Sequence, residues 1–195
     1  MPYPKETDDP IMNSAEQVLK EIEALAYKKH PDMFLPIVGP EKGKLLEDLI
    51  KNYKPKKILE IGTLVGYSAI LMAQHGPNVI SLEVDPKAAE IAKQNIEKAG
   101  LSDKVEIIVG DAKKTIEQLK DKFDMIFIDA KKDECIDYLK LSEKNMKSST
   151  IVVADNVKKF AEEVKDYLDR VRNSGLYESK YHDFGFDAVE VSVRK

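Results

Sequence analysis

The stretch KFDMIFIDAKKDE, residues 122–134, contains an apolar run that ends abruptly at an aspartate. Five of the six residues from Phe123 to Ile128 are apolar, which is typical of a strand buried on both faces of a parallel sheet. Asp129 follows this run directly, and Lys131 and Lys132 come soon after it. A carboxylate at the end of a strand can cap a helix, bind a ribose or bind a metal, so the rest of the chain has to decide its role.

Around this stretch, strand-like runs alternate with helix-like segments. The predicted strands are 57–62, 78–85, 104–112, 123–130 and 149–156, and the predicted helices that follow them are 67–76, 86–99, 112–120, 133–146 and 158–173. This alternation predicts a doubly wound parallel α/β sheet. The tail breaks the rhythm with two strand-like runs, at about 176–182 and 187–194, which predict a hairpin at one edge of the sheet.

The N-terminal part of the chain is expected to be helical. Residues 11–30 have helical apolar spacing that Pro31 stops, and a second helix is predicted at 41–52. Because the chain has no internal repeat and no linker, we expect one domain over residues 1–195, with 1–35 as a helical extension.

The composition is typical of an ordinary globular protein. The chain has 195 residues, of which 43% are hydrophobic and 34% charged, and its net charge of -4 gives no global attraction for nucleic acid or acidic membranes. The lone Cys135 excludes an internal disulfide and a thiolate metal cluster. Since the sequence shows neither the apolar region of a signal peptide nor a membrane-spanning stretch, a cytoplasmic protein without a membrane partner is expected.

The segment LEIGTLVGYSA, residues 59–69, has the features of a ligand-binding loop after a strand. Gly62 allows a tight turn, and Gly66 opens the next helix, whose first N–H groups can face a ligand. The spacing G-x-x-x-G lacks the third glycine or the lysine with which other loops cradle a pyrophosphate. The loop therefore suits an uncharged or zwitterionic nucleoside, and plain turn chemistry is the alternative.

Acidic residues end the next two strands. Glu83 lies 21 positions after Gly62, where its carboxylate can accept hydrogen bonds from ribose hydroxyls. A nucleoside with a free ribose and no phosphate points to S-adenosylmethionine. Asp111 either accepts a hydrogen bond from the adenine amino group or caps the helix that begins near Ala112, and both roles remain open.

Three oxygen-bearing side chains end two neighbouring strands and predict a metal site. Asp129 ends one strand, and Asp155 and Asn156 end the next. Neighbouring parallel strands lie about 4.8 Å apart, so the three side chains can converge. Two carboxylates and an amide oxygen suit Mg²⁺, whereas the histidines fall outside this cluster, which argues against zinc. A turn and helix cap is the alternative for Asp155 and Asn156.

A lysine beside such a site is a candidate general base. A nearby cation and partial burial lower the pKa of a lysine, as a base near neutral pH requires. Lys132 stands three residues after Asp129, Lys131 is the competing candidate, and a solvated surface lysine is the alternative for both.

Six motifs together resemble one family of enzymes. They are VGPEKGKLL (38–46), LEIGTLVGYSA (59–69), SLEVDP (81–86), VGDA (109–112), FIDAKK (127–132) and VADNV (153–157). In their order and spacing, over roughly residues 36–195, the chain resembles the metal- and S-adenosylmethionine-dependent O-methyltransferases of the catechol and caffeoyl-coenzyme A type and their microbial members. The resemblance implies a Rossmann-like methyltransferase fold with a seven-stranded, mostly parallel sheet, an antiparallel last strand and, commonly, a homodimer.

The resemblance also implies roles for individual residues. Expected cofactor-binding residues are Val38 and Gly39 at the methionine end, Gly62, Tyr67 and Ser68 at the amino-acid moiety, Glu83 at the ribose and Asp111 by the adenine, together with Gly66 and Asp129. Asp129, Asp155 and Asn156 are expected to bind Mg²⁺, and the pattern Asp-x-x-Lys favours Lys132 over Lys131 as the catalytic base.

The expected reaction moves a methyl group to a hydroxyl of a catechol-like small molecule. Ala130 and Lys131 stand where animal catechol enzymes have an aromatic wall, and no acidic partner for the second hydroxyl is apparent near residues 181–185. The acceptor pocket is therefore expected to be open and basic. This leaves a hydroxylated tRNA base, such as 5-hydroxyuridine, as the alternative acceptor, and a nucleoside-binding protein without turnover as the alternative class.

Overall fold

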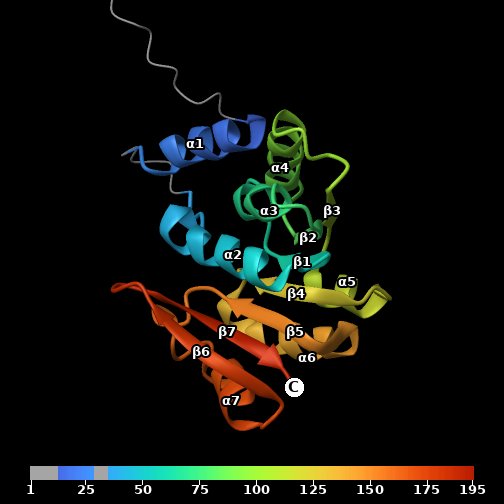
Figure 1. The fold of residues 1–195 in the computed structure, drawn as a ribbon, viewed down its shortest axis with the longest axis vertical. Helices are drawn as coiled ribbons and strands as arrows, with labels where there is room; N and C mark the ends of the chain where they lie inside the picture. Colours follow the sequence, from blue (N-terminus) through green and yellow to red (C-terminus); the bar gives the residue numbers. More distant parts are fainter. Residues whose placement is uncertain (1–12, 29–34) are drawn as a thin grey trace, which may run out of the picture.

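A seven-stranded sheet with the order β3-β2-β1-β4-β5-β7-β6 forms the centre of the molecule (Figure 1). The structure is a computed structural model that describes residues 13–28 and 35–195. The strands are β1 (Lys57–Ile61), β2 (Asn78–Glu83), β3 (Val105–Val109), β4 (Phe123–Ile128), β5 (Met146–Ala154), β6 (Tyr177–Asp183) and β7 (Ala188–Arg194). Strands β1 to β5 run parallel, and β7 runs antiparallel to β5 and β6. The predicted sheet, with its antiparallel last strand and edge hairpin, is confirmed.

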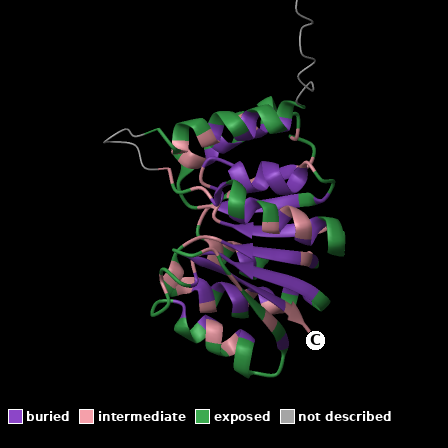
Figure 2. Cartoon of the chain, turned by 60° about the vertical axis from the view of Figure 1, so that its left-hand side comes forward, coloured by how far each residue is buried: buried purple, intermediate pink, exposed green. Residues whose placement is uncertain are grey.

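Helices cover both faces of this sheet, and the strands between them are buried (Figure 2). One face carries α1 (Ser14–Ala26), α2 (Gly39–Tyr53), α3 (Tyr67–Ala73) and α4 (Pro86–Lys98), and the other carries α5 (Ala112–Gln118), α6 (Cys135–Ser142) and α7 (Lys165–Asn173). The short 3-10 helices η1 (Lys132–Glu134) and η2 (Glu143–Asn145) flank α6. The fold is therefore doubly wound, as the alternation of strands and helices predicted.

The central strands alternate their side chains between two apolar cores. Ile58 packs under the α1–α4 face and Leu59 under the α5–α7 face, and Phe127 and Ile128 of β4 divide in the same way. All four side chains are fully buried. Each such burial contributes about 1.5–3 kcal/mol, so a strand that is apolar on both faces is stable only in the middle of this sandwich.

The carboxyl ends of the strands lie at one edge because the backbone hydrogen bonding continues just past them. The N–H of Asp129 donates to the carbonyl of Ile61 at 2.9 Å, and the N–H of Asp155 donates to the carbonyl of Ile128 at 3.1 Å. Gly62 likewise donates to Leu82 at 3.0 Å. The residues that follow β1, β4 and β5 are thus held side by side.

Two predicted helices differ in the structure. The helix predicted at 158–173 begins only at Lys165, and residues 157–164 form turns. The start of this segment is bound to the hairpin, since Val157 N–H donates to the Ala188 carbonyl at 3.0 Å and Lys159 N–H donates to Asp187 Oδ1 at 3.2 Å. The helix predicted at 133–146 is divided among η1, α6 and η2, and Met146 opens β5 by pairing with Phe123. Tertiary pairing thus replaces the helical pattern at the start of the first segment and at the end of the second.

The N-terminal helix packs on the core. Helix α1 contacts α3 and α4, and the Ser14 hydroxyl donates to the Ala99 carbonyl at 2.9 Å. Asn13 caps α1 by accepting from the Glu16 N–H at 2.8 Å. Residues 11, 12, 29 and 30 of the predicted helix, and Pro31, lie outside the described residues.

The turn after β1 requires glycine at position 62. Gly62 has φ of +100°, and a Cβ added there would collide with the backbone carbonyl of Asp129. The absence of a side chain therefore allows the loop after β1 to lie directly against the end of β4, where the pocket described below begins.

Gly62→Ala should destabilise the protein by about 3 kcal/mol or more, since left-handed backbone strain of about 1–2 kcal/mol adds to an overpacking cost of about 1–3 kcal/mol. Gly76→Ala is the matched control, because Gly76 has φ of +113° with no atom within 4 Å of a new Cβ. Urea unfolding of both variants measures the two losses. Equal losses would show that the close approach to Asp129 carries no cost.

Candidate functional site

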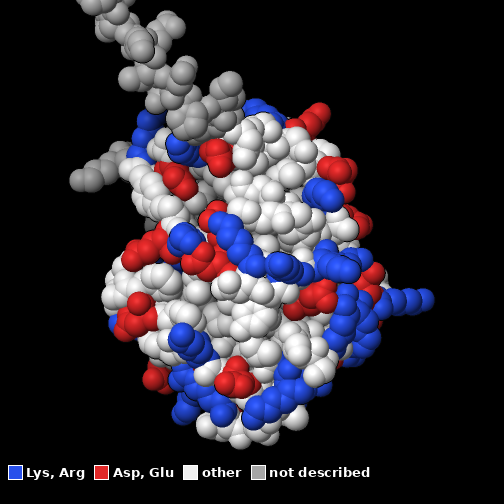
Figure 3. Space-filling view, viewed as in Figure 1, with Lys and Arg blue, Asp and Glu red and all other residues white. Residues whose placement is uncertain are grey.

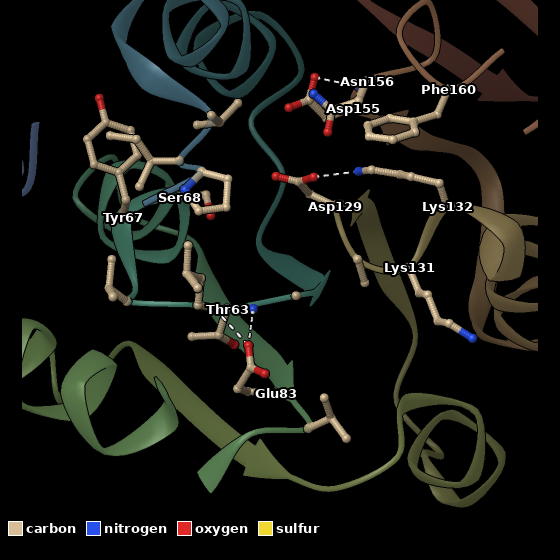
Figure 4. Close-up of a pocket in the computed structure, with 18 of the residues that line it drawn as sticks. Thr63, Tyr67, Ser68, Glu83, Asp129, Lys131, Lys132, Asp155, Asn156 and Phe160 are labelled. Carbon is tan, nitrogen blue, oxygen red and sulfur yellow. Dashed lines mark hydrogen bonds and ion pairs between the residues drawn. The ribbon is translucent and has the colours of Figure 1, made fainter. Parts of the chain in front are cut away.

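A cavity of about 480 Å³ opens at the carboxyl ends of the central strands (Figure 4). The strand order reverses between β1 and β4, and ligands of open α/β sheets bind at such a switch point. One half of the wall comes from residues 36–38, the β1–α3 loop and the end of β2; the other comes from residues 129–132, 155–156 and 159–160. The volume falls in the range of pockets for small organic ligands.

The predicted cofactor-binding residues divide into two groups. Val38, Gly62, Tyr67, Ser68, Glu83 and Asp129 line the cavity, whereas Gly39, Gly66 and Asp111 do not. Gly39 begins α2 and Gly66, with φ of +87°, precedes α3, so both shape segments that carry lining residues. Asp111 caps α5 by accepting from the Lys113 N–H at 2.8 Å, which is the alternative that its position left open. Its contact with adenine stays a prediction.

Glu83 is held against the glycine loop by backbone donors. Its Oε2 accepts from the N–H groups of Thr63 at 3.2 Å and Leu64 at 2.8 Å (Figure 4). Its Oε1 accepts from the N–H of Asp85 at 2.9 Å. A carboxylate offers about four acceptor positions, so about one remains for a ligand hydroxyl. The position of Glu83 in the pocket suits a ribose. If both ribose hydroxyls donate to this carboxylate, one of its three hydrogen bonds from backbone N–H groups has to break.

Tyr67 contributes its ring and not its hydroxyl to the cavity. The hydroxyl donates to the Glu23 carboxylate at 2.5 Å, which joins α3 to α1. Any contact of Tyr67 with a ligand in the cavity would therefore use the ring or the backbone.

A buried acid that the sequence interpretation left without a role lies beneath the loop. Glu60 of β1 is fully buried, and Ser81 of β2 donates to its Oε2 while Thr63 shares a hydrogen bond with Ser81. Its Oε1 has no hydrogen-bond partner among the described residues. Burial raises the pKa of Glu60 to about 8, against the opposing effect of the nearby Ser68 and Ser81 hydroxyls.

The three predicted metal ligands meet at one end of the cavity (Figure 4). Asp155 Oδ1 accepts from Lys42 at 2.6 Å and from the Asn156 N–H at 2.7 Å, and Asn156 Nδ2 donates to Asp187 at 2.5 Å. Asp129 Oδ1 accepts from Lys132 at 2.7 Å. Within residues 13–28 and 35–195, the other oxygens of these side chains (Asp129 Oδ2, Asp155 Oδ2 and Asn156 Oδ1) accept no hydrogen bond.

This donor set fits a hard divalent cation. Burial and the charge of Asp129 raise the pKa of Asp155 against the opposing Lys42 ammonium, so the two carboxylates repel each other and a cation between them would relieve the repulsion. In the described part of the chain, no group of three histidine, cysteine, aspartate or glutamate side chains is placed to hold a metal. The third donor here is an amide oxygen, which Mg²⁺ accepts, and Mg²⁺ binding stays a prediction.

Lys42 and Asp187 support this cluster, and the sequence interpretation missed both. The Lys42 ammonium lies 2.6 Å from both Asp155 and Asp187. Lys42 is 6% exposed and Asp187 is 1% exposed. Burial would raise the pKa of Asp187, but hydrogen bonds from Asn156 and Lys42 outweigh it and lower the pKa to about 2. Burial would lower the pKa of Lys42, but the carboxylates of Asp155 and Asp187 outweigh burial and raise it.

Both residues left a signal in the sequence. Lys42 stands four residues before Leu46 and seven before Leu49, on the buried stripe of α2, where a lysine needs a partner. Asp187 comes directly before the strand β7 and just beyond residues 181–185, where the sequence offers no convincing acidic partner for the acceptor. The expectation that residues 181–185 offer no acidic partner for the second hydroxyl of the acceptor stays a prediction, and Oδ2 of Asp187 already accepts from Lys42 and Asn156.

The two lysines after Asp129 differ sharply. The Lys132 side chain is 12% exposed and its Nζ lies 2.7 Å from Asp129 Oδ1. The Lys131 side chain is 64% exposed, pairs with Glu134 at 3.2 Å and points away from Asp129 (Figure 4). Of these two lysines, Lys132 is therefore the one placed beside the oxygen cluster.

Comparison with known proteins identifies the class of the fold. An O-methyltransferase from Bacillus cereus, solved in complex with SAH, superposes with a TM-score of 0.80 and 29% identity over 96% of this chain and 94% of that one. An O-methyltransferase from Streptomyces achromogenes, in complex with SAM, gives 0.78 and 25% identity over 93% and 87%. The fold is that of the Rossmann-like methyltransferases.

Sequence comparison then identifies the family. Residues 10–176 match the profile described as O-methyltransferase. Catechol O-methyltransferase B of Danio rerio is 38% identical over 154 residues, covering 74% of this chain and 58% of that protein, and catechol O-methyltransferase of Sus scrofa is 34% identical over 174 residues, covering 81% and 92%. The chain belongs to the O-methyltransferase family, and it spans about three fifths of the length of the Danio rerio relative. Among the described residues, no helix combines the length and apolar character needed to cross a membrane.

Glu60→Gln should stabilise the protein at neutral pH and not in acid. The folded state keeps a proton on Glu60 up to a pH of about 8, whereas the unfolded state releases it near the ordinary pKa of 4.5. The stability that the protonated form contributes is therefore complete below pH 4.5 and is lost as the pH rises to about 8. At pH 7 the resulting penalty is about 3 kcal/mol, which glutamine does not incur.

Chemical denaturation of the wild type and the Glu60→Gln variant at pH 5 and pH 7.5 measures this difference. Glu106→Gln is the control, because Glu106 is exposed on β3 and its replacement should give the same small change at both pH values. A Glu60→Gln effect that is equal at the two pH values would contradict the assignment of a protonated Glu60.

Proposed function

We propose that this protein transfers the methyl group of S-adenosylmethionine to a hydroxyl of a catechol-like small molecule, with the help of a divalent cation. The observation that carries the proposal is a cavity in which the β1–α3 loop and Glu83 face the cluster of Asp129, Asp155, Asn156 and Lys132. Membership of the O-methyltransferase family and relatives named catechol O-methyltransferase support it.

The cofactor would occupy the half of the cavity formed by the β1–α3 loop. Glu83 would bind the ribose through its remaining acceptor position, and the loop from Gly62 to Ser68 would surround the methionine part without a pyrophosphate cradle. Structures of similar O-methyltransferases in complex with SAH and SAM support this assignment.

The acceptor would lie at the other end, where Asp129, Asp155 and Asn156 would hold Mg²⁺. Mg²⁺ bound there would lower the pKa of the reacting hydroxyl as a Lewis acid. Lys132 would receive the proton of that hydroxyl at Nζ, which requires the neutral amine. The walls of the cavity would hold the acceptor oxygen, the methyl carbon and the sulfur in line. This lowers the free-energy barrier to methyl transfer, because the entropy of aligning the reactants is lost on binding and not in the chemical step.

A tRNA acceptor finds no support in these relatives, and we do not propose it. Lysine and arginine side chains form a band across one face of the molecule, but acidic side chains are interleaved with them (Figure 3). Such a mixed surface attracts a polyanion weakly. The homodimer and the cytoplasmic location stay predictions from the resemblance and the sequence.

Methylation of a neutral catechol by S-adenosylmethionine should require Mg²⁺ and stop on addition of a chelator. Asp155→Asn should lower the Mg²⁺-dependent turnover by at least ~10-fold, because it removes a charge from the cation site. Calorimetry with S-adenosylhomocysteine should give nearly unchanged binding to this variant. Asp121→Ala, at the opposite edge of the sheet, is the control; wild-type turnover by Asp155→Asn would refute the metal assignment.

Lys132→Ala should lower kcat by about 100-fold or more, the usual contribution of a general base, whereas Lys131→Ala should change it by less than about 3-fold. Addition of a small primary amine should restore part of the activity of Lys132→Ala, since the amine replaces the missing proton acceptor. Steady-state rates with a catechol acceptor measure both effects. A larger loss in Lys131→Ala than in Lys132→Ala would reassign the base.

A further inference from the structure

One lysine in the wall of the cavity lacks an anionic partner. Lys159 lines the acceptor end, and in the described part of the chain its ammonium makes no hydrogen bond and no ion pair. Its contact is with the ring of Phe160, whose centroid lies 5.4 Å from Nζ. A cation on an aromatic face at the rim of a pocket is available to a ligand.

The neighbouring lysines differ from Lys159 in this respect. Lys132 pairs with Asp129 at 2.7 Å, and Lys131 pairs with Glu134 at 3.2 Å. Lys158 pairs with Asp183 at 2.9 Å and also donates to the Gly185 carbonyl. Each of these three ammonium groups is therefore held by a carboxylate of its own, whereas the Lys159 ammonium has no such partner among the described residues.

The backbone holds Lys159 and Phe160 in place beside the oxygen cluster. The N–H of Lys159 donates to Asp187 Oδ1 at 3.2 Å, and the N–H of Phe160 donates to the carbonyl of Asn156 at 3.1 Å. The turn after β5 is thus anchored by the buried carboxylate of Asp187, which also accepts a hydrogen bond from Asn156. Phe160 lines the same end of the cavity as Asp155 and Lys132, and its side chain points toward them in Figure 4.

We propose that Lys159 and Phe160 form a subsite for an anionic substituent on the methyl acceptor, so that the preferred acceptor is an aromatic vicinal diol that carries a carboxylate. This inference rests on the proposed function. With the two hydroxyls at the oxygen cluster, the ring of the acceptor would pack against Phe160. Its carboxylate would then reach the ammonium that lies over the same ring.

The subsite explains why an open acceptor end can still be selective. Lys131, in place of an aromatic wall, points away from the oxygen cluster, which leaves Phe160 as the aromatic surface on this side of the cavity within the described residues. Because Lys159 is exposed, salt screens its charge, and the ion pair should favour an anionic acceptor by roughly fivefold at low ionic strength.

A matched pair of acceptors tests the subsite: 3,4-dihydroxybenzoate and its neutral analogue 3,4-dihydroxybenzamide. The measured quantity is the ratio of their kcat/KM values with S-adenosylmethionine and Mg²⁺ at low salt. The ratio in Lys159→Gln should fall roughly fivefold below that of the wild type, and 0.5 M NaCl should produce much of the same fall in the wild type. Comparing ratios between proteins removes the different intrinsic reactivities of the two acceptors.

Two further variants make the test specific. Lys158→Gln removes the same charge one residue away and should leave the ratio at the wild-type value, because the Lys158 ammonium is bound to Asp183 and Gly185. Lys159→Glu should push the ratio below that of Lys159→Gln. A ratio that is the same in the wild type and Lys159→Gln would overturn the subsite while leaving the proposed function intact. No turnover of the neutral acceptor by the wild type would instead overturn the proposed function, and the subsite with it.

Discussion

The bridge of the Lys42 ammonium between the buried carboxylates of Asp155 and Asp187 is the interaction on which the rest of the site depends. It joins α2, the end of β5 and the start of β7, and both contacts are 2.6 Å long. Removing one member of a buried ion pair costs about 3–5 kcal/mol because the partner charge is left uncompensated. One oxygen of Asp155 and the amide nitrogen of Asn156 are occupied within this network, which leaves their other oxygens for the cavity.

The sheet makes this arrangement possible and also imposes strain near it. Backbone hydrogen bonds beyond the strand ends hold Asp129 and Asp155 side by side, although their charges repel. Beneath them, Glu60 occupies a position that an apolar residue would fill at less cost, because its fully buried carboxyl keeps a proton up to a pH of about 8. Polar groups buried at such a cost are common in functional sites, where the geometry of the site outweighs stability.

Much of the fold and part of the site were predictable from sequence. The central strands are mostly apolar on both faces, so their alternation with helices follows from local pattern, as do the strand-end positions of Asp129, Asp155 and Asn156. Helix bounds were less predictable: residues 158–164 have a helical pattern, yet the N–H groups of Val157 and Lys159 donate to the hairpin, and no local pattern contains that information. Asp111 had two possible roles in the sequence, and the structure shows it capping α5.

The sequence by itself determined which residues end the strands. It also determined that Lys132 comes three residues after Asp129, close enough for the two side chains to meet. Period and polarity suffice for this, because the carboxyl ends of parallel strands must share one edge. Only the tertiary structure decided that Lys42 contacts Asp155 and Asp187, which lie 113 and 145 residues away. It also decided that Lys131 has an anionic partner, whereas Lys159 has none among the described residues. Such pairings depend on how α2, β5 and β7 pack, and packing joins residues whose separation along the chain carries no signal.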